Sequence, residues 1–169
     1  MPAREETAGA APKPDVSVEE VVSASPQVLY DLVSDVTRMG EWSPETTSCR
    51  WLGASGAPVV GARFRGSNKF GWRRWSTLCT VVAAERGARF SFDVSVAGLP
   101  VSRWTYEFLA EGQGSRVRES WTDRRPGWMA RSAAVVMGIR DRDGHNREGM
   151  ESTLAALRRV AESTDSGPA

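Results

Sequence analysis

Residues 24–45, ASPQVLYDLVSDVTRMGEWSPE, decide the fold, because they combine a strong helix start with an abrupt stop. Ser25 can cap the helix, and Pro26 suits its first position. The apolar side chains recur at helical spacing and would form one buried stripe: Val28, Leu29, Leu32, Val33 and Val36. Gly40 is expected to end this helix, and Pro44 forces extended backbone on Ser43, so EWSPE should form a second short turn or helix.

Strands are expected on both sides of this helix. VSVEEVVS, from Val16, precedes it, and stretches with alternating apolar and polar residues follow it. The clearest are 74–82, 89–98, 102–108 and 116–123, and the weaker ones are 48–53 and 61–66. Short glycine-containing turns join them, so the pattern predicts an antiparallel meander of about seven strands.

The pattern becomes helical after Pro126. A largely apolar piece covers 128–139, and an amphipathic one runs from His145 to Glu162. Its expected buried stripe is Met150, Leu154, Leu157 and Ala161, with an outward pair of Arg147 and Glu151 one turn apart. The predicted order is therefore strand, helix, short helix, six strands and a long helix, an α+β fold.

This order of elements predicts a cavity. Seven strands at about 4.8 Å spacing make a sheet roughly 30 Å wide, whereas a helix is only about 10 Å across. One helix cannot cover such a face, so the sheet must curl around it. Space left beside the helix would form an apolar pocket, and its few polar groups would decide what it binds.

The element order resembles the helix-grip fold of the START/SRPBCC superfamily. Residues 24–45 are similar to the opening signature of its bacterial polyketide cyclase/dehydrase and lipid transport branch, in which a capped helix and an Asp precede Trp-Ser-Pro. HNREGMESTLAALRRVAE, residues 145–162, resembles the closing helix of small actinobacterial members. The resemblance covers about 16–162. It implies a curved seven-stranded antiparallel sheet around a long C-terminal helix, two short helices after the first strand, an apolar cavity and no cofactor.

Length and composition favour one domain that binds a small partner. We expect a single domain over 16–163 of the 169 residues, with disordered tails at 1–15 and 164–169. The net charge of +1 predicts no strong electrostatic attraction to nucleic acid or to an anionic membrane. Cys49 and Cys79 lack metal-binding spacing, and the longest apolar run, 133–139, is too short to span a bilayer. We therefore expect a cytoplasmic protein with reduced thiols, no metal and no stable membrane insertion.

Strand alternation and the last helix predict which side chains line the cavity. The expected set is Trp42, Phe64, Trp75, Phe90, Phe92, Val94, Trp104, Tyr106, Phe108, Glu119, Trp121, Asn146, Met150 and Leu154. Trp42 has two interpretations, since it could close the pocket mouth or clamp the short helix onto the sheet. The large rings are core in either case, and the functional hypothesis is only that some of them border empty space.

Glu119 breaks the pattern, because alternation puts its carboxyl group on the face of Val117 and Trp121. A carboxyl group there must be paired, hydrogen-bonded or protonated. It could polarise a carbonyl group or abstract a proton in a cyclase-type reaction, with Tyr106 as a further candidate. The favoured interpretation over such a catalytic role is an internal salt bridge, to an arginine such as Arg63 if its strand turns it inward.

His145 is the only histidine, and it lies at a helix start beside Asp143 and Asn146. The favoured interpretation is a polar contact that ties this helix start to the preceding segment. The alternative is a hydrogen bond to a ligand at the pocket rim, with Asn146 beside it and Met150 one turn deeper. The chain has no second histidine and no serine or cysteine nucleophile signature, so a triad or a histidine metal site has little support.

Three hypotheses for function follow. The first is the binding of a hydrophobic small molecule, lipid-like or aromatic, for transport or sequestration. The second is a cofactor-independent enzyme of the cyclase/aromatase or dehydratase type, with Glu119, Tyr106 and His145 as candidates for catalysis and Asn146 as a further polar group. The third is a homodimeric interaction module with a filled cavity, using the apolar segment 128–139 as its contact.

Overall fold

The computed structural model describes residues 13–53, 56–129 and 141–165. Its elements follow the order expected from the sequence. They are β1 (Val16–Val22), α1 (Pro26–Ser34), the 3-10 helix η1 (Val36–Glu41), β2 (Thr46–Leu52), β3 (Arg63–Phe70), β4 (Arg73–Glu85), β5 (Arg89–Val96), β6 (Leu99–Glu111), β7 (Gly114–Asp123) and α3 (Arg142–Asp165).

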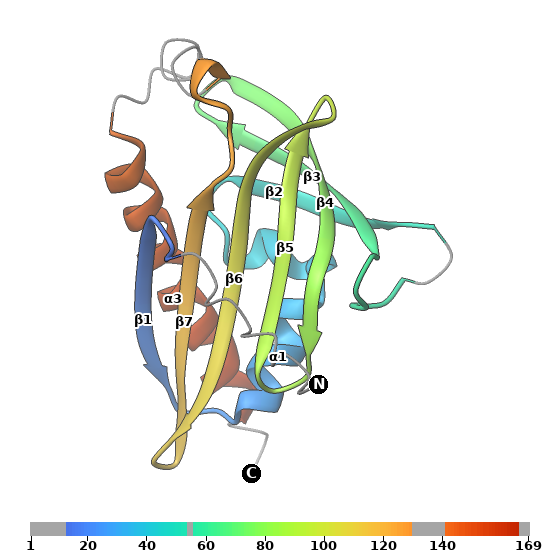
Figure 1. Cartoon of the computed structure of the whole chain (residues 1–169). Helices are drawn as coiled ribbons and strands as arrows, with labels where there is room; N and C mark the ends of the chain where they lie inside the picture. The colour runs from blue at the N-terminus through green and yellow to red at the C-terminus, as the bar shows by residue number, and fades with distance from the viewer. Residues whose placement is uncertain (1–12, 54–55, 130–140, 166–169) are drawn as a thin grey trace, which may run out of the picture.

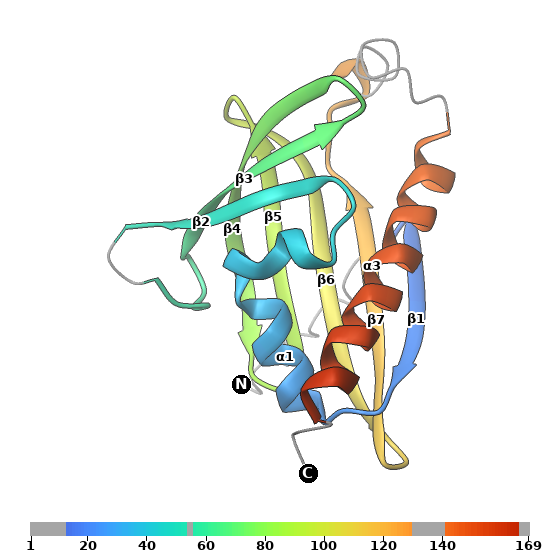
Figure 2. The same ribbon diagram turned by 180° about the vertical axis from the view of Figure 1, so that it is seen from behind.

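All seven strands form one antiparallel sheet in the order β1-β7-β6-β5-β4-β3-β2. The sheet curves, and α3 lies against its concave side over β1 and β7 (Figure 1). Seen from behind, α1 and η1 lie on that same side, and α1 is next to the C-terminal half of α3 (Figure 2). This is the helix-grip architecture that the family resemblance implies.

The start of α1 agrees with the sequence prediction, and its end does not. Ser25 Oγ accepts a hydrogen bond from the backbone N–H of Val28, 3.3 Å away. Val28 itself is 41% exposed, so it does not belong to the buried stripe. The helix ends at Ser34, well before Gly40, because Asp35 accepts from the N–H of Thr37 and caps a new helix. Of the short turn or helix expected at EWSPE, the turn is present at Trp42, and the short helix, η1, lies earlier and ends at Glu41.

The last helix begins earlier than expected. Asp141 accepts from the backbone N–H groups of Gly144 and His145, and α3 starts at Arg142. The predicted stripe is fully buried: Met150, Leu154, Leu157 and Ala161. Arg147 donates to the carbonyl oxygen of Ser17 on β1, 3.4 Å away, which fastens the helix start to the sheet edge.

At both ends, ordered contacts or helix extend slightly beyond the residues 16–163 that the sequence predicts for the domain. Asp15, placed in the N-terminal tail by the sequence, hydrogen-bonds Trp121 and Asp123 of β7 through its backbone and its carboxylate. At the other end, α3 extends to Asp165, beyond the expected boundary at 163. Residues 1–12, 166–169 and most of the expected apolar helix at 128–139 lie outside the described residues.

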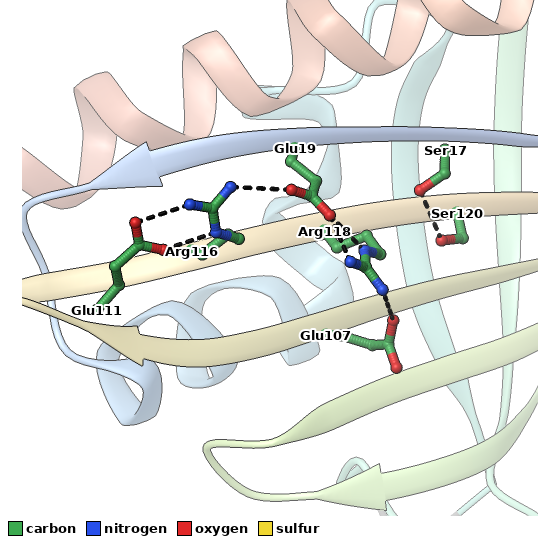
Figure 3. Close-up of polar contacts among 7 residues, drawn as sticks. All are labelled: Ser17, Glu19, Glu107, Glu111, Arg116, Arg118 and Ser120. Carbon is green, nitrogen blue, oxygen red and sulfur yellow. Dashed lines mark hydrogen bonds and ion pairs between the residues drawn. The ribbon is translucent and has the colours of Figure 1, made fainter.

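The two faces of the sheet differ in chemistry. On the face turned away from α3, Glu19 accepts from Arg116 at 3.0 Å and from Arg118 at 2.6 Å (Figure 3). The same arginines reach Glu111 at 2.6 Å and Glu107 at 3.7 Å. Partly exposed ion pairs of this kind contribute little to stability. The concave face instead carries the apolar rings, so the core and the candidate site both lie there.

Candidate functional site

A cavity of about 470 Å³ lies between the concave sheet and the start of α3. Strand pairing brings its aromatic walls together: Phe92 is opposite Trp104, and Trp104 is opposite Trp121. The predicted lining residues that border it are Phe64, Trp75, Phe92, Val94, Trp104, Tyr106, Glu119, Trp121, Asn146 and Met150. The cavity can therefore hold an apolar molecule against several aromatic faces.

Four predicted lining residues lie in the core instead: Trp42, Phe90, Phe108 and Leu154. Tyr30 of α1 packs edge-on against Phe90 and Phe108, with ring centroids 6.2 and 6.1 Å away, and fills the space over them. Trp42 is buried at the end of η1, in agreement with the structural interpretation of that residue. Leu154 lies one turn beyond Met150 and contributes to the packed part of α3.

The sequence analysis missed a polar and sulfur-containing wall that η1, β2, β3 and β4 supply. Its members include Met39, Cys49, Asn68, Thr77 and Cys79. Cys79 and Thr77 share the alternating face of Trp75 on β4, and that signal could have identified them. The alternating patterns of β2 and β3 were too weak to predict that Cys49 and Asn68 line the cavity.

Most polar groups of this wall already have partners. The Asn68 amide accepts from Thr46 at 3.2 Å and donates to Thr77 at 3.3 Å. Burial raises the pKa of Cys49 to about 11 and that of Cys79 to about 12. Both thiols therefore stay protonated at neutral pH and are poor nucleophiles.

Glu119 is the buried acid of the cavity. It is 1% exposed, and the phenol of Tyr106, directly opposite on β6, donates to its Oε1 at 2.7 Å. Arg63 is exposed on the other face of β3, so the expected internal salt bridge to it is wrong. Desolvation raises the pKa of Glu119 to about 8, although the Tyr106 hydrogen bond works in the opposite direction. Burial also raises the pKa of Tyr106 well above its usual value of 10.

Two buried atoms of the site lack hydrogen-bond partners. In the described part of the chain, these are the second carboxyl oxygen of Glu119, Oε2, and the amide nitrogen of Asn146, Nδ2. Glu119 and Asn146 both line the cavity. Buried polar groups without partners are rare in proteins, and each calls for an explanation.

His145 lies at the rim and takes no part in the Glu119 cluster. Its Nε2 is 2.6 Å from Oε1 of Glu45, and its ring packs edge-on against Phe70 of β3, with centroids 5.0 Å apart. The imidazole therefore ties the helix start to a residue a hundred positions earlier, and residues 130–140 of the segment just before the helix lie outside the described residues. His145 and Glu119 have separate partners, so no hydrogen-bonded relay joins them.

Two further observations bear on the kind of site. Over residues 13–53, 56–129 and 141–165, no group of three or more His, Cys, Asp and Glu side chains is arranged to hold a metal ion. No helix within these same ranges is long and apolar enough to cross a membrane.

Comparison with known proteins places the chain in a family. The sequence profile of the family described as polyketide cyclase/dehydrase and lipid transport matches residues 13–162. The chain belongs to this family. The polyketide cyclase/dehydrase and lipid transport family has the helix-grip fold of the SRPBCC superfamily, which agrees with the resemblance found in the sequence. A comparison with curated protein sequences found no match.

Solved structures share the fold. A Polyketide_cyc-like protein, Cgl2372 of Corynebacterium glutamicum, is 31% identical over 90% of this chain and 94% of its own, with a TM-score of 0.58. TTHA0849 of Thermus thermophilus is 20% identical over 88% of this chain and 97% of its own, with a TM-score of 0.62. DynU16, from the dynemicin biosynthetic locus, is 19% identical over 90% of this chain and 49% of its own, with a TM-score of 0.61.

Proposed function

We propose that the protein binds a hydrophobic small molecule, aromatic or lipid-like, in the cavity between the sheet and α3. One observation carries this proposal: a cavity of about 470 Å³ has Phe92, Trp104 and Trp121 among its lining residues. A ligand that covers these rings gains the free energy of removing apolar surface from water, about 25 cal/mol per Å² before ordering costs. Micromolar affinity for a small aromatic molecule is consistent with that gain.

The alternative of an interaction module requires a filled interior, and the cavity argues against it. Its expected contact segment, 128–139, lies mostly outside the described residues. The family description, which names lipid transport beside cyclase and dehydrase activity, supports a ligand-binding role.

A titration with N-phenyl-1-naphthylamine tests the proposal, because this neutral dye fluoresces strongly in apolar surroundings. Saturable binding to the folded protein, with a change in tryptophan emission, is the expected result, since Trp75, Trp104 and Trp121 line the cavity. The titration must be done far below the unfolding temperature, because partly unfolded protein also exposes apolar surface. Absence of saturable binding would contradict the proposal. Native mass spectrometry of gently purified protein would then look for a co-purifying molecule.

A cyclase or dehydratase activity is the second candidate. The raised pKa of Glu119, about 8, favours it, because an acid that keeps its proton near neutral pH can donate to a substrate carbonyl oxygen. The test is to incubate a linear poly-β-ketone thioester with the protein and to detect ring closure by mass spectrometry. Loss of general acid catalysis in Glu119→Gln would slow ring closure roughly a hundredfold or more. Equal rates with and without protein would exclude this activity for that substrate.

A further inference from the structure

The unpartnered atoms of Glu119 and Asn146 carry information about the ligand. Tyr106 occupies Oε1 of Glu119, so Oε2 is the atom left for a second partner. A buried carboxyl group in its neutral form has one O–H, and because the phenol donates to Oε1, that proton belongs on Oε2. Glu119 therefore presents an O–H donor from β7 while it is neutral.

Asn146 presents the second donor. Its Nδ2 carries two hydrogens and accepts nothing, and it is buried without a partner. Met150, one turn further along α3, continues the same wall of the cavity. Leaving such donors unpaired costs more free energy than an average hydrogen bond contributes, so a ligand that pairs them gains selectivity.

The fold brings the two donors toward the same end of the sheet. Asn146 lies in the first turns of α3, where its neighbour Arg147 reaches the carbonyl oxygen of Ser17. The next residue of β1, Val18, is directly opposite Glu119 on β7. Both side chains border one cavity, which also has aromatic walls such as Trp104 and Trp121 and a polar and sulfur-containing wall.

We infer that the ligand is a largely apolar molecule with a hydrogen-bond-accepting oxygen of the ketone or ester carbonyl type, to which Glu119 and Asn146 donate. This inference rests on the proposed binding function and specifies its ligand class. A hydrocarbon would leave both donors unpaired. A ligand with only N–H donors would place donor against donor, and neither could form a hydrogen bond.

The protonation of Glu119 supplies a pH test. Burial raises its pKa to about 8, so it is a donor at pH 6 and a carboxylate acceptor at pH 9.5. Tyr106 of β6 and the apolar Val18 of β1 are paired with Glu119 across the strands, and Asn146 and Met150 of α3 line the same cavity. The other titratable groups lining the cavity are Glu45, Cys49, Cys79, His145 and Glu148.

The experiment uses three probes of nearly equal shape. Fluorene offers no strong polar group, 9-fluorenone adds a carbonyl acceptor, and carbazole adds an N–H donor. Each competes with N-phenyl-1-naphthylamine for the full-length protein. At pH 6 we expect 9-fluorenone to bind roughly three- to tenfold more tightly than fluorene, and carbazole to show no such gain. At pH 9.5 the affinity for 9-fluorenone should fall, that for carbazole should rise, and that for fluorene should stay constant.

Two variants separate the donors. Glu119→Gln keeps an N–H donor at every pH, so the preference for 9-fluorenone should persist while its pH dependence disappears. Asn146→Leu should lose part of the preference and keep the pH dependence. Matched controls are Glu107→Gln, on the outer face, and Gln113→Leu, in the exposed turn between β6 and β7. If Asn146→Leu fails to fold, the pH profile of the wild type and the result for Glu119→Gln still test whether Glu119 donates to the ligand.

The possible results separate this inference from the proposed function. Binding of the dye with equal affinities for the three probes at pH 6 would overturn the inference and leave the binding function intact. A 9-fluorenone preference that is unchanged in both Glu119→Gln and Asn146→Leu, at pH 6 and at pH 9.5, would also overturn it. Absence of binding by the dye and by all three probes would contradict the proposed function and the inference together.

Discussion

Tyr106 and Glu119 are directly opposite each other on β6 and β7, and the phenol donates to the carboxyl group across 2.7 Å. Both side chains are buried on the concave face, where no basic group of the described residues is within bonding distance of Glu119. A hydroxyl partner, unlike an arginine, cannot balance a negative charge. The acid is therefore held in a position where its neutral form is favoured.

The first prediction concerns stability against pH. In the unfolded chain the pKa of Glu119 returns to its ordinary value of 4.5, whereas in the folded chain it is about 8. Below about pH 4.5 the group is protonated in both states, and its contribution to stability is fully present. As pH rises, the unfolded state loses its proton first, so this contribution is lost progressively up to about pH 8.

Glu119→Gln should therefore match wild type near pH 4 and be more stable near pH 8, by an amount on the order of a few kcal/mol. Urea unfolding at both pH values measures the difference. Glu107→Gln, on the outer face, is the control and should show no comparable gain. A constant difference between Glu119→Gln and wild type across this range would contradict the raised pKa.

Tyr106→Phe provides a second prediction. The Tyr106 hydrogen bond lowers the pKa of Glu119, so its removal should raise that pKa above about 8. Loss of a buried hydrogen bond with an unpaired partner left behind should cost about 1–3 kcal/mol of unfolding free energy. Carbon-13 NMR of the Glu119 carboxyl group follows the titration directly. A pKa that stays the same or falls in Tyr106→Phe would show that the phenol does not stabilise the carboxylate.

The sequence predicts elements better than it predicts the cavity, and particular residues explain why. Alternation places Glu119 beside Trp121, and helical spacing places Met150 on the buried face of α3, because both depend only on local periodicity. The assignment of Phe90 to the cavity failed since Tyr30, from α1, fills that space. Likewise, the contact of His145 with Glu45 joins segments a hundred residues apart, and no local pattern encodes such a pairing.

The third prediction concerns the thiols. Cys49 and Cys79 are buried, and their pKa values are raised to about 11 and about 12. Native protein at pH 8 should therefore react with 5,5′-dithiobis(2-nitrobenzoic acid) at least about a hundredfold more slowly than urea-unfolded protein, because the thiolate is the reactive form. Cys49 lines the cavity, so N-phenyl-1-naphthylamine should slow its reaction further. Rapid modification of the native protein would contradict this account of the wall.

A fourth prediction concerns His145. Its contacts with Glu45, just before β2, and with Phe70, at the end of β3, join the start of α3 to the far side of the cavity mouth at a partly exposed rim. Partly exposed contacts of this kind contribute little to stability, so His145→Gln should lower the unfolding free energy by no more than about 1 kcal/mol. If an activity is found, His145→Gln should retain most of it. A fall of roughly a hundredfold would instead identify His145 as a general acid or base.

The last prediction fills the cavity. Val94 of β5 lies opposite Cys79 and Ser102, and all three border the empty space. Val94→Phe directs a ring into that space without displacing a packed neighbour, so the unfolding free energy should change by less than about 1.5 kcal/mol. The same ring occupies the volume a ligand needs, so the affinity for N-phenyl-1-naphthylamine should fall at least about tenfold, or 1.4 kcal/mol. Val21→Phe is the matched control, because Val21 is 51% exposed on β1 and does not line the cavity. Equal dye affinity in the two variants, with both folded, would place the dye outside the cavity and remove the main support for the proposed function.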